Sequence, residues 1–207
     1  MDIEQIDNIY RSRITILDIL EERGYDTSPY RKFSPVEAAI ASNALSSLNI
    51  ALVHREDAAR ICHLVYINNT TTAAVSETLT GFKPEEDAEH TFVEVVVMTF
   101  VENLEKYHAV AAKQYMTNKL RVFFFNIPRI VNNPTRHVLV PKHEIVARDE
   151  HKALLERLSV VEKRQLPFIT SADPIIRCIG GVPGDIVRIL RPSPSAGLYE
   201  VYRLVVP

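Results

Sequence analysis

The stretch Gly184-Asp-Ile-Val-Arg-Ile-Leu-Arg191, with Tyr202-Arg-Leu-Val-Val206 after it, decides the fold of the C-terminal part of this 207-residue chain. Pro183 stands directly before it, and Pro-Gly is typical of a type II turn because proline fixes φ at one central position and glycine accepts a positive φ at the next. We therefore predict a strand over residues 185–191, a loop over 192–197 and a second strand over 198–206.

Both predicted strands carry apolar side chains on both faces, as the adjacent pairs Ile186-Val187 and Leu204-Val205 illustrate. A strand that is apolar on both faces is usually covered on both. Two interpretations stay open. Either helices of this unit and the rest of the chain cover the strands, or one face or edge docks on a partner chain.

Helices and an arm are predicted around this pair. Residues 137–146 favour an edge strand or extended arm, because a proline interrupts them. Residues 148–158 place one histidine and three leucines on one helical face. Asp173-Pro174 is typical of a helix start, with Asp as N-cap and Pro at the first helical position. Gly180-Gly181 ends that helix.

The N-terminal part has a different pattern. Residues 3–22 follow the helical period, and Gly24 ends that helix. Ser34-Pro-Val-Glu37 is a capping box that begins a second helix to about residue 47. Strands then alternate with helices, which implies an α/β domain with partly parallel pairing. The predicted strands are residues 50–54, 63–67, 92–100 and 120–127, the predicted helices are 71–82 and 101–116, and the acidic residues 83–89 form a solvated loop.

The predicted fold class is α+β or α/β, with two domains. Residues 1–135 form an N-terminal α/β domain with a mixed sheet, and residues 136–207 form a small C-terminal α/β domain. The boundary falls in the proline- and asparagine-rich residues 128–134.

Composition indicates a soluble protein. Hydrophobic residues make up 46% and charged residues 24% of the chain, and the net charge of −2 does not predict binding to polyanions. The two cysteines lie far apart in apolar surroundings, which is typical of buried thiols in a reducing compartment. No apolar run is long enough to span a membrane, and the N-terminus lacks a signal-peptide core.

Motifs for chemistry are absent from the sequence. The seven histidines have no metal-ligand spacing, and no glycine-rich phosphate loop is present. We therefore expect no catalytic residue, no metal and no cofactor. One enzymatic alternative stays open, because Glu94 in Phe92-Val-Glu-Val-Val96 has the position of a strand carboxylate in metal-dependent nucleases. Those enzymes have a lysine where this chain has Val96.

Short motifs in the C-terminal part occur in an order and spacing that resemble a known family. They are Leu139-Val-Pro-Lys-His143, Gln165-Leu-Pro167, Asp173-Pro174, Gly184, Val187-Arg188-Ile189, Arg191-Pro-Ser193, Ala196-Gly197 and Tyr202-Arg-Leu-Val205. This part resembles the assembly domain of the fifth shared subunit of eukaryotic nuclear RNA polymerases, a family that also has archaeal members. The N-terminal part is similar to the jaw domain of the eukaryotic forms, which the archaeal forms lack. The opening helix of that jaw ends in Arg-Gly-Tyr, as at Arg23-Gly-Tyr25.

The resemblance implies a non-catalytic subunit of a multisubunit DNA-dependent RNA polymerase, with nucleotidyl transfer left to the large subunits. It implies that the C-terminal domain docks on the largest subunit and that the N-terminal domain projects as a lower jaw near downstream DNA. Other polymerase subunits and downstream DNA are then the expected partners. The candidate docking residues are His143, Arg191, Ser193, Ser195, Tyr202 and Arg203.

The expected location of the chain depends on whether the polymerase is cellular or viral. A cellular polymerase places the chain in the nucleus, and a viral one places it in the host cytoplasm or the virion. The functional alternatives are the nuclease-like enzyme and a protein-binding adaptor outside the polymerase.

Overall fold

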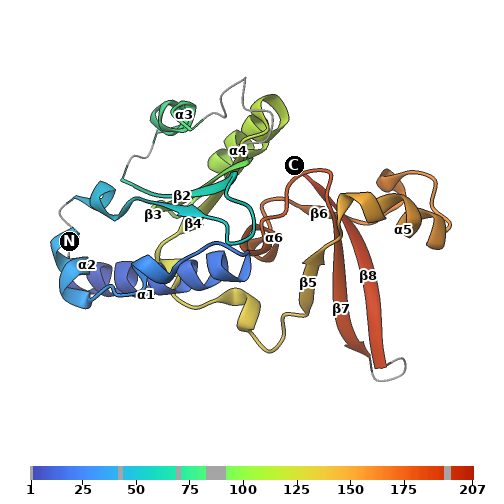
Figure 1. Cartoon of the computed structure of the whole chain (residues 1–207), viewed down its shortest axis with the longest axis horizontal. Helices are drawn as coiled ribbons and strands as arrows, with labels where there is room; N and C mark the ends of the chain where they lie inside the picture. Colours follow the sequence, from blue (N-terminus) through green and yellow to red (C-terminus); the bar gives the residue numbers. More distant parts are fainter. Residues whose placement is uncertain (1, 42–43, 69–70, 83–91, 194–196) are drawn as a thin grey trace. The chain divides into compact units, whose positions relative to one another are not determined.

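The computed structural model describes residues 2–41, 44–68, 71–82, 92–193 and 197–207. The chain divides into two compact units, Met1–Asn133 and Pro134–Pro207 (Figure 1). Each unit contains helices and one four-stranded mixed sheet, so the predicted fold class is confirmed. The acidic loop predicted over residues 83–89 lies outside the described residues.

The N-terminal unit is built on a sheet with the strand order β1-β2-β3-β4. β1 and β2 are antiparallel, whereas β2, β3 and β4 are parallel to one another. The strands are β1 Ile50–Val53, β2 Arg60–Ile67, β3 Phe92–Thr99 and β4 Arg121–Asn126. β3 is therefore an inner strand, as its continuous apolar run predicts.

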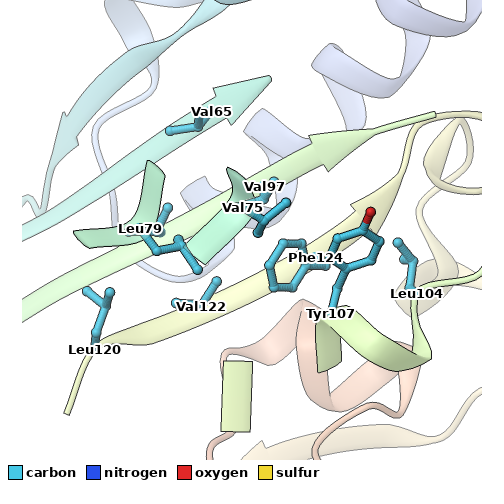
Figure 2. Close-up of a cluster of buried hydrophobic side chains, with 10 residues drawn as sticks. Val65, Val75, Leu79, Val97, Leu104, Tyr107, Leu120, Val122 and Phe124 are labelled. Atoms are coloured by element: carbon cyan, nitrogen blue, oxygen red, sulfur yellow. The ribbon is translucent and has the colours of Figure 1, made fainter. Parts of the chain in front are cut away.

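Helices cover both faces of this sheet. α3 (Thr72–Thr80) and α4 (Glu105–Asn118) lie on one side, and α1 (Ile3–Glu22) lies on the other (Figure 1). Figure 2 shows the core beneath α3 and α4, where Phe124 of β4 packs among side chains from strands and helices. Phe124 is 0% exposed. Burial of one such side chain stabilises the fold by about 1.5–3 kcal/mol.

Two helix boundaries in this unit differ from the predictions. α2 (Pro35–Ala41) has the predicted capping box, but Leu45–Leu48 is a 3-10 helix and Ala44 is not helical. Asn49 follows this 3-10 helix and joins its end to the sheet, because the Asn49 side chain accepts the backbone N–H of Tyr66 in β2.

The start of α4 is also later than predicted. The carbonyl of Val101 accepts a hydrogen bond from the Asn126 side chain, and the Asn103 side chain accepts the N–H of Glu105. Polar side chains thus hold the residues before Glu105 outside the helix.

The C-terminal unit has the strand order β5-β7-β8-β6. β5 is antiparallel to β7, β7 is antiparallel to β8, and β6 is parallel to β8. The strands are β5 Lys142–Ile145, β6 Phe168–Thr170, β7 Ile186–Ser193 and β8 Gly197–Val206. β5 is the predicted edge strand. β6 has only three residues, too short to show an alternating pattern, and the sequence did not predict it.

The two short helices of this unit cover opposite faces of the β7–β8 hairpin. Directly opposite residues of an antiparallel pair lie on the same face. On the α5 face, Leu154 of α5 (His151–Arg157) packs in a cluster with Ile186 and Leu204. On the α6 face, Ile176 of α6 (Pro174–Ile179) packs in a cluster with residues of β7 and β8.

Local signals fix α6 and the turn that follows it. The Asp173 side chain accepts the N–H groups of Ile175 and Ile176, and Gly180 ends the helix with φ 79°. The N–H of Asp185 then donates to the carbonyl of Val182 at 3.1 Å, with Gly184 at φ 94°. These bonds confirm the predicted N-cap and the predicted turn, which starts β7 in the correct register.

Gly184→Val should cost about 1–3 kcal/mol of unfolding free energy, because an L-residue is strained at this φ. A Cβ at this position would meet no atom within 4 Å, so a clash at Cβ does not add to the cost. Gly81→Val is the matched control, since Gly81 has an ordinary φ of −69°. Urea unfolding of both variants is the measurement, and equal midpoints would contradict the turn assignment.

Independent folding of the C-terminal unit stays a prediction. Residues 134–207 contain the capped helix α6, both hairpin strands and apolar side chains that cover both faces of the hairpin at the end where α5 and α6 lie. We expect the isolated fragment to give a dispersed amide NMR spectrum. A collapsed spectrum would mean that the unit needs residues 1–133 to fold.

Candidate functional site

The β7–β8 hairpin continues beyond both of its neighbouring strands. β5 pairs with β7 only as far as Leu190, and β6 pairs with β8 only from Leu204 onward. Residues 191–193 and 197–199 therefore form a two-stranded segment, here called the hairpin arm, which extends away from α5 and α6 (Figure 1). A two-stranded ribbon without further strands or helices is marginally stable in water.

Large side chains of the arm are exposed on both faces. Leu198 is 71% exposed and lies opposite Pro192 on the α5 face. Tyr199 is 58% exposed and lies opposite Arg191 on the α6 face. An exposed leucine and tyrosine next to each other suit a contact with another molecule better than contact with water.

The α6 face carries unbalanced positive charge. The charge comes from Arg191 of β7 and Arg203 of β8, His143 of β5 lies on the same face, and the described strand residues on this face include no carboxylate. The Arg203 guanidinium donates to the carbonyl of Phe168 at 2.9 Å, which fixes its position at the start of β6. In the part of the chain that the structure describes, no ion pair of Arg191 is found. This face can therefore attract an acidic partner.

The α5 face has a network in which cations and carboxylates pair with one another. Glu144 pairs with Lys142 at 2.5 Å and with Arg188. Hydrogen bonds from these two cations lower the pKa of the Glu144 carboxyl, and the bond from Lys142 has the larger effect. The Tyr202 hydroxyl donates to Glu200 at 2.6 Å and accepts from Arg157 at 2.6 Å. Glu144, Arg157, Arg188 and Tyr202, together with Glu150, line a cleft of about 430 Å³ between α5 and the sheet. Because its charges neutralise one another, this cleft has no clear preference for a charged ligand.

The structure separates the predicted docking residues. His143, Arg191, Ser193 and Arg203 lie together on the α6 face. Tyr202 lies on the α5 face and is only 8% exposed, inside the network just described. Ser195 lies outside the described residues.

Sequence reasoning missed two exposed residues, Leu198 and Tyr199. Their signal was present in the sequence, because two adjacent apolar residues in a strand must point to opposite faces. One of them is then uncovered unless both faces are covered at that point.

Glu94, the carboxylate of the nuclease alternative, is buried and already paired. Its side chain forms an ion pair with Arg23 and accepts a hydrogen bond from the Tyr25 hydroxyl at 3.2 Å. The Arg23 guanidinium also lies 4.8 Å from the centre of the Phe123 ring. A carboxylate used in this way is not open to a metal ion, and the described residues contain no group of three or more metal-binding side chains.

The other reactive groups near Glu94 are held in their protonated forms. Burial raises the pKa of the Cys62 thiol to about 12 and that of the Tyr25 hydroxyl to about 12. Neither group is an activated nucleophile at neutral pH.

Among the described helices, none is long and apolar enough to cross a membrane.

Comparison with known proteins identifies the family. The family model described as "RNA polymerase Rpb5, C-terminal domain" matches residues 132–205. The "DNA-directed RNA polymerase subunit Rpo5" of Pyrococcus horikoshii is 49% identical over 74 residues, which are 36% of this chain and 89% of that protein. The chain belongs to the Rpb5 family of RNA polymerase subunits.

Two eukaryotic members of the Rpb5 family match nearly the whole chain. The "DNA-directed RNA polymerases I, II, and III subunit rpabc1" of Dictyostelium discoideum is 29% identical over 205 residues, covering 99% of this chain and 100% of that protein. The corresponding protein of Caenorhabditis briggsae is 28% identical over 207 residues, covering 96% of this chain and 95% of that protein. These relatives are named as polymerase subunits, which supports the accessory role over the nuclease and adaptor alternatives.

Glu94→Ala should destabilise the full chain by about 3–5 kcal/mol, because it leaves the buried Arg23 guanidinium without its carboxylate. Glu144→Ala is the control and should cost no more than about 1 kcal/mol, since its pairs are partly exposed. Chemical unfolding of both variants measures the difference. Similar losses in the two would mean that the buried pair has no special structural role.

Proposed function

We propose that this chain is a non-catalytic subunit of a multisubunit DNA-dependent RNA polymerase and that its C-terminal unit docks on the largest subunit through the hairpin arm. The observation that carries the docking proposal is the exposure of Leu198 and Tyr199 beside Arg191 on an otherwise uncovered ribbon. Nucleotidyl transfer belongs to the large subunits, and this chain contributes binding surface.

The chemistry of the arm suits a protein interface. Arginine and tyrosine are the side chains most frequent at energetic hot spots, because they combine a large contact area with directional hydrogen bonds. Leu198 supplies apolar area on the other face of the same ribbon. A partner that covers the arm removes this apolar surface from water, so docking also stabilises the ribbon.

For the N-terminal unit we propose the role of a jaw near downstream DNA. The support is its α/β fold and the full-length match to eukaryotic subunits of polymerases I, II and III. Downstream DNA and other polymerase subunits are then its neighbours. We place the chain with the cellular transcription machinery, which in a eukaryote means the nucleus.

Arg191→Glu and Tyr199→Ala should each weaken capture by the largest polymerase subunit by about tenfold or more. Both side chains are exposed, so the melting temperature of the free chain should stay unchanged. Tyr202→Phe is the control, because it removes a hydroxyl from the α5 face and leaves the arm intact. Surface plasmon resonance with the immobilised largest subunit measures affinity.

The outcome decides whether the hairpin arm is the docking surface. Loss in the two arm variants with normal binding of Tyr202→Phe supports docking through the arm. Wild-type affinity in both arm variants would remove the arm from the interface.

A further inference from the structure

The backbone of β8 has one paired side and one partly open side. In the antiparallel β7–β8 pair, alternate residues turn their N–H and C=O groups toward the partner strand. The N–H of Val205 donates to the carbonyl of Asp185 in the chain segment leading into β7 at 2.9 Å. The residues of β8 whose backbone N–H and C=O groups point away from β7 are therefore the even-numbered ones. The bond from the N–H of Leu204 to the carbonyl of Pro167, at 2.9 Å, agrees with this assignment.

β6 occupies only the last part of this outer edge. Its pairing begins at Leu204, so it does not reach the outward backbone groups of Leu198 and Glu200. Among the described residues, none forms a backbone hydrogen bond with these groups. Residues 197–200 are also exposed, so the edge is accessible from solvent.

The other edges of this sheet are protected against strand pairing. On the outer edge of β7, β5 pairs as far as Leu190, and the next outward residue is Pro192, which has no N–H. β5 itself has four residues and follows Pro141, and β6 has three and follows Pro167. Short strands and prolines are the usual protection of exposed edges. The outer edge of β8 from Gly197 to Arg203 contains no proline.

The side chains next to this open edge indicate the partner's chemistry. Tyr199 and Arg203 lie on the α6 face of β8, and Arg191 lies opposite Tyr199 on β7. Side chains of an added strand alternate between the two faces of the sheet. Acidic residues at alternate positions would therefore lie on the face that carries the two arginines, and apolar residues between them would lie on the side of Leu198.

We propose that the open edge of β8 binds an extended segment of the polymerase partner as an added β-strand, with acidic side chains toward the α6 face. This inference rests on the proposed docking function and assigns its binding mode. Backbone hydrogen bonds to Leu198 and Glu200 supply register, and the two arginines supply selectivity for the acidic face.

Amide hydrogen exchange of the full chain, free and bound to the largest polymerase subunit, tests the pairing directly. The amides of Leu198 and Glu200 should exchange rapidly in the free chain and at least about 100-fold more slowly in the complex. The amide of Val201 points toward β7 and is the internal control, because it is hydrogen-bonded in both states. Unchanged exchange at Leu198 and Glu200 in a saturated complex overturns strand addition.

A pair of variants separates the backbone contact from the side-chain contact. Leu198→Ala removes the side chain, whereas Leu198→Pro also removes the outward N–H and leaves the bonds to β7 in place. Capture of the proline variant should be about tenfold weaker than that of the alanine variant. Melting of the free variants checks that both stay folded.

The result also distinguishes this inference from the docking proposal. If Arg191→Glu weakens capture while the proline and alanine variants bind equally, docking stands and strand addition fails. If none of these variants weakens capture, the arm is not the docking surface and both fail.

Discussion

The C-terminal unit depends on one constraint: the β7–β8 hairpin is apolar on both faces, so each face needs its own covering element. Two helices meet this need at one end, with α5 over Leu204 and Ile186 and α6 over Val187 and Val205. Each helix is short, seven residues in α5 and six in α6, so neither can extend over the whole hairpin. The uncovered arm is thus a direct consequence of strands longer than the helices that cover them.

A buried ion pair organises the N-terminal unit in a comparable way. Arg23 and Tyr25, at the end of α1, both bind Glu94 of the inner strand β3. Gly24 between them needs its positive φ of 94°, and a Cβ there would lie 2.4 Å from Nε2 of His54. The Arg-Gly-Tyr sequence therefore has a physical explanation, since the glycine makes the helix end and the two neighbours join that end to the sheet. The same pairing occupies the carboxylate that suggested a nuclease.

The sequence predicted most elements of the C-terminal unit because their signals are local. Asp173 at a helix start and Pro183-Gly184 at a turn act through their own backbone, so their effects can be read without tertiary context. Predictions failed where distant partners decide the structure. The helix expected to residue 47 is interrupted before Asn49, whose side chain binds Tyr66, and β6 exists only because β8 lies beside it.

The candidate site was predictable in composition and less so in geometry. Sequence reasoning selected polar residues beside the strand pair, but it grouped Tyr202 with Arg203, although adjacent strand residues point to opposite faces. The register shows why this matters. Tyr202 is held by hydrogen bonds to Glu200 and Arg157, whereas Arg203 belongs to a face whose described strand residues include no carboxylate. A shift of one residue in the pairing of β8 would exchange the two faces of β8 and move Arg203 to the α5 face. The turn at Gly184, which fixes where β7 begins, therefore also determines which face of the hairpin can attract an acidic partner.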